Sequence, residues 1–122
     1  MIIVEGIDHV SIAVTNLSAS AKFYSDLFDF EVLDDSNSKF TIMTLDPIKV
    51  KLVLVDKVEN QLSGSLTPVL SFVLDVDDFT EAISEIEEKG IKIVKGPESA
   101  GKGEALVFKD PDNNLIEIFY QS

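Results

Sequence analysis

The sequence predicts an α+β protein built from two copies of one β-α-β-β-β module. The main observation is an internal repeat, because residues 7–17 (IDHVSIAVTNL) and 69–79 (VLSFVLDVDDF) superimpose at a fixed offset of 62 positions. In both copies an alternating apolar strand runs into a residue that can cap a helix, Asn16 in the first copy and Asp78 in the second. Strand-like runs separated by turn residues follow each predicted helix. We therefore expect the two halves to build any functional site together.

The first module, at about residues 5–57, is predicted to open with a strand at 9–14. Larger apolar side chains alternate there with smaller ones, so the larger side is expected to face a helix. That helix is predicted at 17–28, where apolar residues recur at spacings of three and four. Turn residues then separate three further predicted strands, at 30–34, 38–45 and 48–56.

The second module, at about residues 68–121, is predicted to repeat this order after a polar connection at 59–68. Its helix is expected to begin after Asp78, with Glu81 completing a capping box, and to end at Gly90. Strands are predicted near 91–95, 104–109 and 114–120. A half of about 60 residues would be marginally stable alone, so the sequence predicts a single domain over residues 1–122.

Composition excludes several classes of function. The chain has no cysteine, so it has no disulfide, thiolate metal site or thiol nucleophile, and a cytoplasmic location is expected. The opening MIIVEG lacks the basic segment of a signal peptide, and no apolar run approaches the roughly 20 residues of a membrane span. A net charge of −12 argues against nucleic acid and anionic membranes as partners. The same charge favours a cationic ligand, although the acidic residues sit in turns and on polar helix faces, where a solvated surface explains them.

Glu117 and His9 are the candidate site residues that the sequence itself points to. Glu117 interrupts an otherwise apolar strand, and a buried carboxylate costs several kcal/mol unless a cation, a metal or hydrogen-bond donors satisfy it. The alternative is a glutamate on an edge strand open to water. His9 is the only histidine, and it suits a metal ligand or a proton carrier, although a lone histidine is more often structural. The sequence offers no obvious third ligand for a catalytic metal.

Four other features have simpler interpretations. Residues 96–103 imitate a phosphate-binding loop but lack its hydroxyl residue and its helix, so a mobile loop is predicted. Residues 110–121 imitate a calcium loop but lack its turn glycine and its final glutamate, so a hairpin turn is predicted. Lys51 and Asp75 are expected on the pocket side of their strands, as candidate ligand contacts or as solvated charges.

The segments IDHVSIAV, FYSDLFDFEV and DPDNNLIEIFY resemble the vicinal oxygen chelate superfamily. This superfamily includes glyoxalase I, extradiol dioxygenases, methylmalonyl-CoA epimerase, fosfomycin resistance enzymes and bleomycin-binding proteins. The resemblance spans essentially the whole chain. It implies a glyoxalase-like fold, in which two βαβββ modules form a curved mixed sheet around a cavity. It also implies a homodimer, since small members of the superfamily commonly pair.

The resemblance also assigns metal positions, of which this chain keeps half. His9 matches the metal ligand of the first strand and Glu117 the metal ligand of the last strand. Ser71 occupies the histidine position of the second module, and the glutamate position of the first module falls near Val53. Ser71 and Val53 are therefore candidate ligand contacts only. A divalent metal is the one cofactor that the pattern implies, completed by water or a partner chain.

Two functions follow from the resemblance. The first is a metal-dependent lyase, isomerase or dioxygenase acting on a small oxygenated metabolite, with the ion held by His9 and Glu117. Glu117 is alternatively a general base that acts without metal. The second is a non-catalytic protein of the bleomycin-resistance type that sequesters a cationic small molecule in an acidic apolar groove. A scaffold that has kept its fold and lost its chemistry is the remaining alternative.

Overall fold

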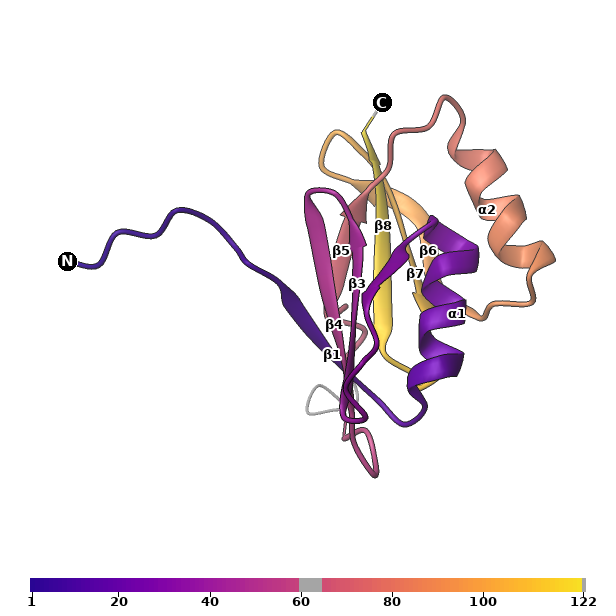
Figure 1. The fold of residues 1–122 in the computed structure, drawn as a ribbon. Helices are drawn as coiled ribbons and strands as arrows, with labels where there is room; N and C mark the ends of the chain where they lie inside the picture. The colour runs from indigo at the N-terminus through magenta and orange to yellow at the C-terminus, as the bar shows by residue number, and fades with distance from the viewer. Residues whose placement is uncertain (60–64, 122) are drawn as a thin grey trace. The chain divides into compact units, whose positions relative to one another are not determined.

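The predicted element order occurs twice in the computed structural model, which describes residues 1–59 and 65–121 (Figure 1). By their contacts, the residues divide into two compact units, Met1–Val58 and Glu59–Ser122. The first unit contains β1 (Val10–Val14), α1 (Leu17–Phe28), β2 (Glu31–Asp34), β3 (Phe40–Leu45) and β4 (Ile48–Leu54). The second contains β5 (Leu70–Val73), α2 (Phe79–Glu88), β6 (Ile93–Ala100), β7 (Gly103–Lys109) and β8 (Leu115–Gln121). The predicted α+β class with two modules is confirmed.

The first unit is a four-stranded mixed sheet in the order β1-β4-β3-β2. Its first strand pairs in parallel with its last, and the other neighbours are antiparallel. Along each of the three strands β1, β3 and β4, buried residues alternate with less buried ones, which is the period expected when one face of a sheet is covered. The buried set is Ile12, Val14, Thr41, Met43, Val50 and Leu52. Helix α1 packs on β3 and β4 and contributes the buried Tyr24 to this core.

The second unit repeats this topology with the order β5-β8-β7-β6. Its strand β5 pairs in parallel with β8, and β8 pairs with β7 in antiparallel register. The largest buried side chains of this sheet are Leu106, Phe108, Ile116 and Ile118. Helix α2 is tied to the sheet by Phe79, whose ring stacks on Tyr120 with centroids 5.6 Å apart.

Both predicted helix caps are confirmed. Asn16 accepts a 3.0 Å hydrogen bond from the backbone amide of Ala19, and Asp78 accepts one of 2.9 Å from that of Thr80. Gly90 ends the second helix with a φ of 71°, which glycine adopts without strain. The caps explain why strand turns into helix at equivalent places in the two modules.

Three sequence-based boundaries are corrected or remain open. Residues 96–103 are not mainly a loop, because β6 continues to Ala100 and turns directly into β7. Gly96 and Pro97 fit there because β6 is an edge strand whose register shifts between Lys95 and Glu98, as in a β-bulge. The first strand of the second module ends at Val73, whereas the repeat offset of 62 aligns the last residue of β1, Val14, with Val76. The connection predicted at 59–68 lies partly outside the described residues.

The described residues contain no helix that is long and apolar enough to cross a membrane.

The predicted turn between β7 and β8 is confirmed, and Asp110 organises it. Asp110 is 4% exposed and accepts hydrogen bonds from the backbone amides of Asp112 and Asn114. The side-chain amide of Asn114 donates a third bond, at 2.9 Å. These carboxylate oxygens are therefore used in the turn.

We predict that Gly103→Ala destabilises the second unit, because a Cβ at this position would collide with the backbone carbonyl of Tyr120 on the neighbouring strand. The expected loss in the free energy of unfolding is about 1 to 3 kcal/mol, as for overpacked sites. The measurement is chemical denaturation. Gly6→Ala is the control, since nothing lies within 4 Å of its added Cβ. Equal stability of the two variants would contradict the close strand approach.

Candidate functional site

The second unit brings Ser71 and Glu117 together on neighbouring strands. They are register partners in the parallel β5–β8 pair, and the Ser71 hydroxyl donates a 2.6 Å hydrogen bond to Oε1 of Glu117. Glu117 is half-buried, and β8 lies between β5 and β7. The alternative of an edge-strand glutamate is therefore wrong. Instead, the carboxylate occupies an interior strand and is held there by a neighbouring hydroxyl.

Apart from Ser71, the nearest neighbours of Glu117 on its own face of the sheet are apolar. Val107 of β7 is its register partner on the other side and is buried. Leu115 and Phe119 precede and follow it on the same face, as the alternation along the strand predicts. A carboxylate has about four acceptor positions, of which the Ser71 hydroxyl uses one. The group can therefore still accept hydrogen bonds from a ligand or coordinate a cation.

His9 lies just before β1 in the first unit and is paired with its neighbour in sequence. Its Nδ1 lies 2.7 Å from Oδ2 of Asp8, with side-chain exposures of 36% for His9 and 80% for Asp8. The hydrogen bond with His9 lowers the pKa of Asp8, and the positive charge of Lys49 lowers it further. An imidazole held by a carboxylate on one nitrogen keeps its other nitrogen for a ligand. His9 and Glu117 belong to different units, so their joint action stays a prediction.

The strand register corrects the glutamate position of the first module. The pairing of β1 with β4 begins with Val10 and Val50, and its continuation by one residue would place His9 level with Lys49. In the second unit the corresponding pair is Ser71 with Glu117. On this continued register the counterpart of Glu117 in the first module would be Lys49, whereas the family pattern placed it near Val53. The fixed offset of the repeat cannot locate this position, because the two modules differ in length between their first and last strands.

The remaining candidates are placed as follows. Val53 and Lys51 lie on β4 with half-buried side chains, on the face opposite to the buried Val50 and Leu52. Asp75 is exposed and lies beyond the end of β5, so its predicted place on the pocket side of a strand is wrong. The strand ends early because β5 pairs with β8 only from Leu70 to Val73.

The described residues do not gather a complete metal centre. They contain no group of three or more histidine, cysteine, aspartate or glutamate side chains placed to hold an ion. A catalytic metal usually has three protein ligands, and Ser71 offers a neutral hydroxyl where an imidazole would bind strongly. The donors around Glu117 therefore do not fit such a centre by themselves.

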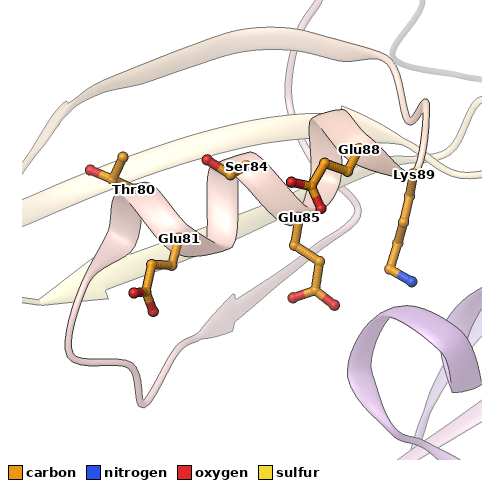
Figure 2. Close-up of a pocket in the computed structure, with 6 residues that line it drawn as sticks. All are labelled: Thr80, Glu81, Ser84, Glu85, Glu88 and Lys89. Carbon is orange, nitrogen blue, oxygen red and sulfur yellow. The ribbon is translucent and has the colours of Figure 1, made fainter.

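A pocket on the outer side of α2 is a poor candidate for a functional site (Figure 2). It is lined by Thr80, Glu81, Ser84, Glu85, Glu88 and Lys89, all exposed residues of one helix or its cap. Figure 2 shows these side chains spread along the helix rather than converging on one point. Such a solvated charged face is typical of an amphipathic helix.

The comparisons with known proteins agree with the fold. A family model described as Glyoxalase/Bleomycin resistance protein/Dioxygenase superfamily matches residues 6–118. Virulence protein STM3117 of Salmonella typhimurium is 30% identical, with 95% of this chain and 84% of the relative covered. Metallothiol transferase FosB of Staphylococcus epidermidis is 26% identical, with 94% and 81% covered. A mutant of the fosfomycin resistance protein FosX from Listeria monocytogenes, complexed with Mn(II) and 1S,2S-dihydroxypropylphosphonic acid, superimposes with a TM-score of 0.81 at 20% identity, covering 98% and 93%.

Two β-α-β-β-β units, each with its first strand beside its last, define a protein of the glyoxalase-like class. The chain belongs to the glyoxalase/bleomycin resistance protein/dioxygenase superfamily. The family predicted from the sequence, also called vicinal oxygen chelate, is thereby confirmed.

We predict that His9→Ala raises the pKa of Asp8 toward its ordinary value of 3.8, because the variant loses the hydrogen bond that stabilises the carboxylate. A lowered folded-state pKa stabilises the fold above the unfolded value, and this stability is lost as the pH falls through the folded value. The loss of stability that protonation of Asp8 causes at low pH should therefore be smaller in the variant. Carboxyl-carbon NMR titration measures the change.

Asp34 is the internal control in the same titration. Its pKa is lowered by hydrogen bonds from Ser36 and not by His9. An unchanged pKa of Asp8 in the variant, or an equal change in the pKa of Asp34, would contradict the contact between His9 and Asp8.

Proposed function

We propose that this chain binds a small polar metabolite through Glu117 and does so without a complete metal centre. The observation that carries the proposal is the 2.6 Å hydrogen bond from Ser71 to Glu117. This bond supports a Glu117 carboxylate that is fixed in position and partly desolvated. Its partner, Ser71, offers a hydroxyl where the family pattern has a metal-binding histidine. A fixed carboxylate needs no reorganisation before it binds, which favours affinity.

The chemistry of this group indicates the kind of ligand. An ionised carboxylate only accepts hydrogen bonds, so its partner must donate them from an ammonium, guanidinium or hydroxyl group. Such charge-assisted bonds are stronger in a partly buried position than in water. The apolar neighbours Val107 and Phe119 would contact the carbon skeleton of the ligand. A net charge of −12 also draws cations toward the protein.

A metal-dependent enzyme is the second candidate, and one specific observation favours it. The FosX structure that superimposes on this chain contains Mn(II). A divalent ion held here by Glu117 and His9, with water or a partner chain completing the coordination, would make the protein a lyase, isomerase or dioxygenase of its family. Such an ion acts as a Lewis acid toward oxygen atoms of the substrate. The first candidate requires that Ser71 keeps the affinity for a divalent metal low. The second requires that a divalent metal binds although Ser71 replaces a histidine.

We predict that Ser71→His increases the affinity for Mn²⁺, because it places an imidazole beside Glu117. Thermal melting measures this, since a ligand that binds only the folded state raises the melting temperature. Wild-type protein should respond weakly to Mn²⁺ and the variant strongly. The response should disappear when Glu117→Gln is added to Ser71→His.

Val73→His is the matched control, because Val73 lies on the same face of β5 but pairs with Phe119. It should leave the Mn²⁺ response at the wild-type level. The first candidate is overturned, and the second established, if the wild-type protein purifies with stoichiometric metal and the Glu117→Gln variant purifies without it.

The ligand itself is sought by titrating metal-free protein with small amines, guanidines and polyols while the melting temperature is followed. A ligand of the proposed class should stabilise the wild type and not Glu117→Gln, which keeps the shape of the side chain and removes its charge. Equal stabilisation of both proteins by every such compound would place the binding elsewhere.

We also propose that the protein forms a homodimer through its N-terminal segment, defined as residues 1–7. Five large apolar side chains of this segment are at least 77% exposed, namely Met1, Ile2, Ile3, Val4 and Ile7. The segment extends away from β1 and has no strand partner among the described residues (Figure 1). Large exposed apolar runs of this kind mark interaction surfaces.

A second copy of the chain is the partner that fits. The segment is rich in β-branched residues that favour strands, and it has unpaired backbone groups. Strand β5 ends its sheet and carries Val73, which is 71% exposed. Reciprocal addition of each segment to β5 of the other copy would close a two-fold dimer. Burying each aliphatic side chain contributes roughly 1.5 to 3 kcal/mol.

We predict that Ile3→Asp converts the dimer to a monomer, because an ionised carboxylate would have to be buried against β5. Sedimentation velocity measures the mass. Val32→Asp, which alters an exposed apolar residue on the edge strand β2, should remain dimeric. Added salt should strengthen the wild-type dimer by screening repulsion between the acidic copies. A monomeric wild type, or a dimeric Ile3→Asp, would overturn the proposal.

A further inference from the structure

Strand β2 leaves one backbone edge of the first sheet without a neighbour. It is the terminal strand in the order β1-β4-β3-β2, and within residues 1–59 and 65–121 its strand partner is β3. All residues of β2 are exposed, and its two apolar side chains, Val32 and Leu33, are 46% and 57% exposed. The amide and carbonyl groups on the outer side of β2 can therefore pair with a further strand.

The equivalent edge of the second unit is protected against such pairing. Strand β6 is terminal in the order β5-β8-β7-β6, and its Pro97 has no amide hydrogen to donate. Its register shifts between Lys95 and Glu98, whose charged groups also pair at 3.2 Å. Proline, bulges and paired charges keep edge strands from recruiting another strand. β2 shares a register shift, between Val32 and Asp34, but it contains no proline and no basic residue.

The charged residues around β2 are all acidic. Residues 29–35 (DFEVLDD) contain four acids and no lysine or arginine. These acids are exposed, and none forms an ion pair with a lysine of the described residues; they are Asp29, Glu31, Asp34 and Asp35. Oδ1 of Asp34 accepts hydrogen bonds from the amide and the hydroxyl of Ser36, at 2.9 and 2.7 Å, which hold this carboxylate at the end of the strand. Two exposed apolar residues of an open edge thus lie between carboxylates that lack a counter-charge.

The charge of this edge decides which kind of strand can pair with it. A second copy of β2 is disfavoured, because Glu31 and Asp34 of the two copies would lie close together and like charges destabilise a strand pair. Opposite charges on neighbouring strands stabilise the pair instead. An extended segment that combines basic and apolar side chains is therefore complementary to β2 in both charge and apolar surface.

We propose that β2 binds a basic, extended peptide segment of another protein, which adds to the first sheet as a further edge strand. Main-chain hydrogen bonds to β2 supply affinity, and side chains supply selectivity. Lysine or arginine of the partner would form charge-assisted hydrogen bonds with Glu31 and Asp34. Its apolar side chains would cover Val32 and Leu33. This surface is distinct from the Glu117 carboxylate and from the N-terminal segment, so the proposal does not depend on either.

The test is fluorescence anisotropy of a short labelled peptide in which lysine alternates with valine, titrated with the full chain. Constant ionic strength keeps charge screening equal throughout. The same peptide with its backbone amides N-methylated keeps its charge but loses its backbone donors. It separates strand pairing from general attraction to an acidic protein.

Two variants of β2 and one matched control are compared with the wild type. Leu33→Lys adds to the edge a charge that repels the peptide. Glu31→Gln combined with Asp34→Asn removes two charges and keeps side chains that can accept hydrogen bonds. The control combines Glu85→Gln with Glu88→Gln, which removes the same number of charges from the exposed face of α2. Melting curves verify that each variant is folded.

We expect saturable binding by the wild type that weakens about tenfold or more in both β2 variants, where tenfold corresponds to about 1.4 kcal/mol. The N-methylated peptide should lose affinity to a similar degree, and the α2 control should bind within a few-fold of the wild type. The proposal is overturned if the unmodified peptide does not bind saturably, if the N-methylated peptide binds equally well, or if the α2 control loses as much affinity as the β2 variants.

Glu117→Gln separates this proposal from the one made for Glu117. The variant should bind the peptide as the wild type does, because Glu117 lies in the other unit and on an interior strand. Loss of peptide binding in Glu117→Gln would assign the peptide to that carboxylate and overturn binding at β2. Conversely, failure of small amines, guanidines and polyols to bind at Glu117 would leave the result for β2 unchanged.

Discussion

The parallel hydrogen bonding between the first and last strands of each module is the constraint on which the rest of this structure depends. It joins β1 to β4 and β5 to β8. A parallel pair requires a crossover connection, and here the connection includes a helix that covers one side of the sheet. On the other side, side chains from the first and last strands lie at neighbouring register positions. Ser71 meets Glu117 on that side although 46 positions separate them in the sequence.

The same framework carries opposite charges in the two modules. The last strand of the second unit carries Glu117, whereas the last strand of the first unit carries Lys49 and Lys51. Divergence of this kind costs the fold little, because the alternating residues that face the helices remain apolar in both units. It illustrates why membership of a superfamily fixes the scaffold and leaves the chemistry to individual positions.

Local patterns were sufficient for the element order because each depends on residues near in sequence. Asn16 and Asp78 cap their helices through amides two or three residues away, and alternation along β1 or β8 needs only the strand itself. The errors arose where distant strands decide the outcome. β6 extends through Gly96 and Pro97 because a bulge in β6 lets it continue to pair with β7, and β5 stops at Val73 because its register with β8 stops there. Neither partner can be read from the segment itself.

The sequence by itself determined that Glu117 interrupts an apolar strand, that His9 is the only imidazole, and that two equivalent modules exist. The tertiary structure alone decided which side chain each of them meets. Strand register is set by long-range pairing, and a slip of one residue would turn Ser71 away from Glu117. The pairing of β3 with β4 likewise brings Lys51 to the ring of Phe40. Composition supplies the charged groups, but backbone hydrogen bonding between distant strands selects their neighbours and thus the ligands that they can bind.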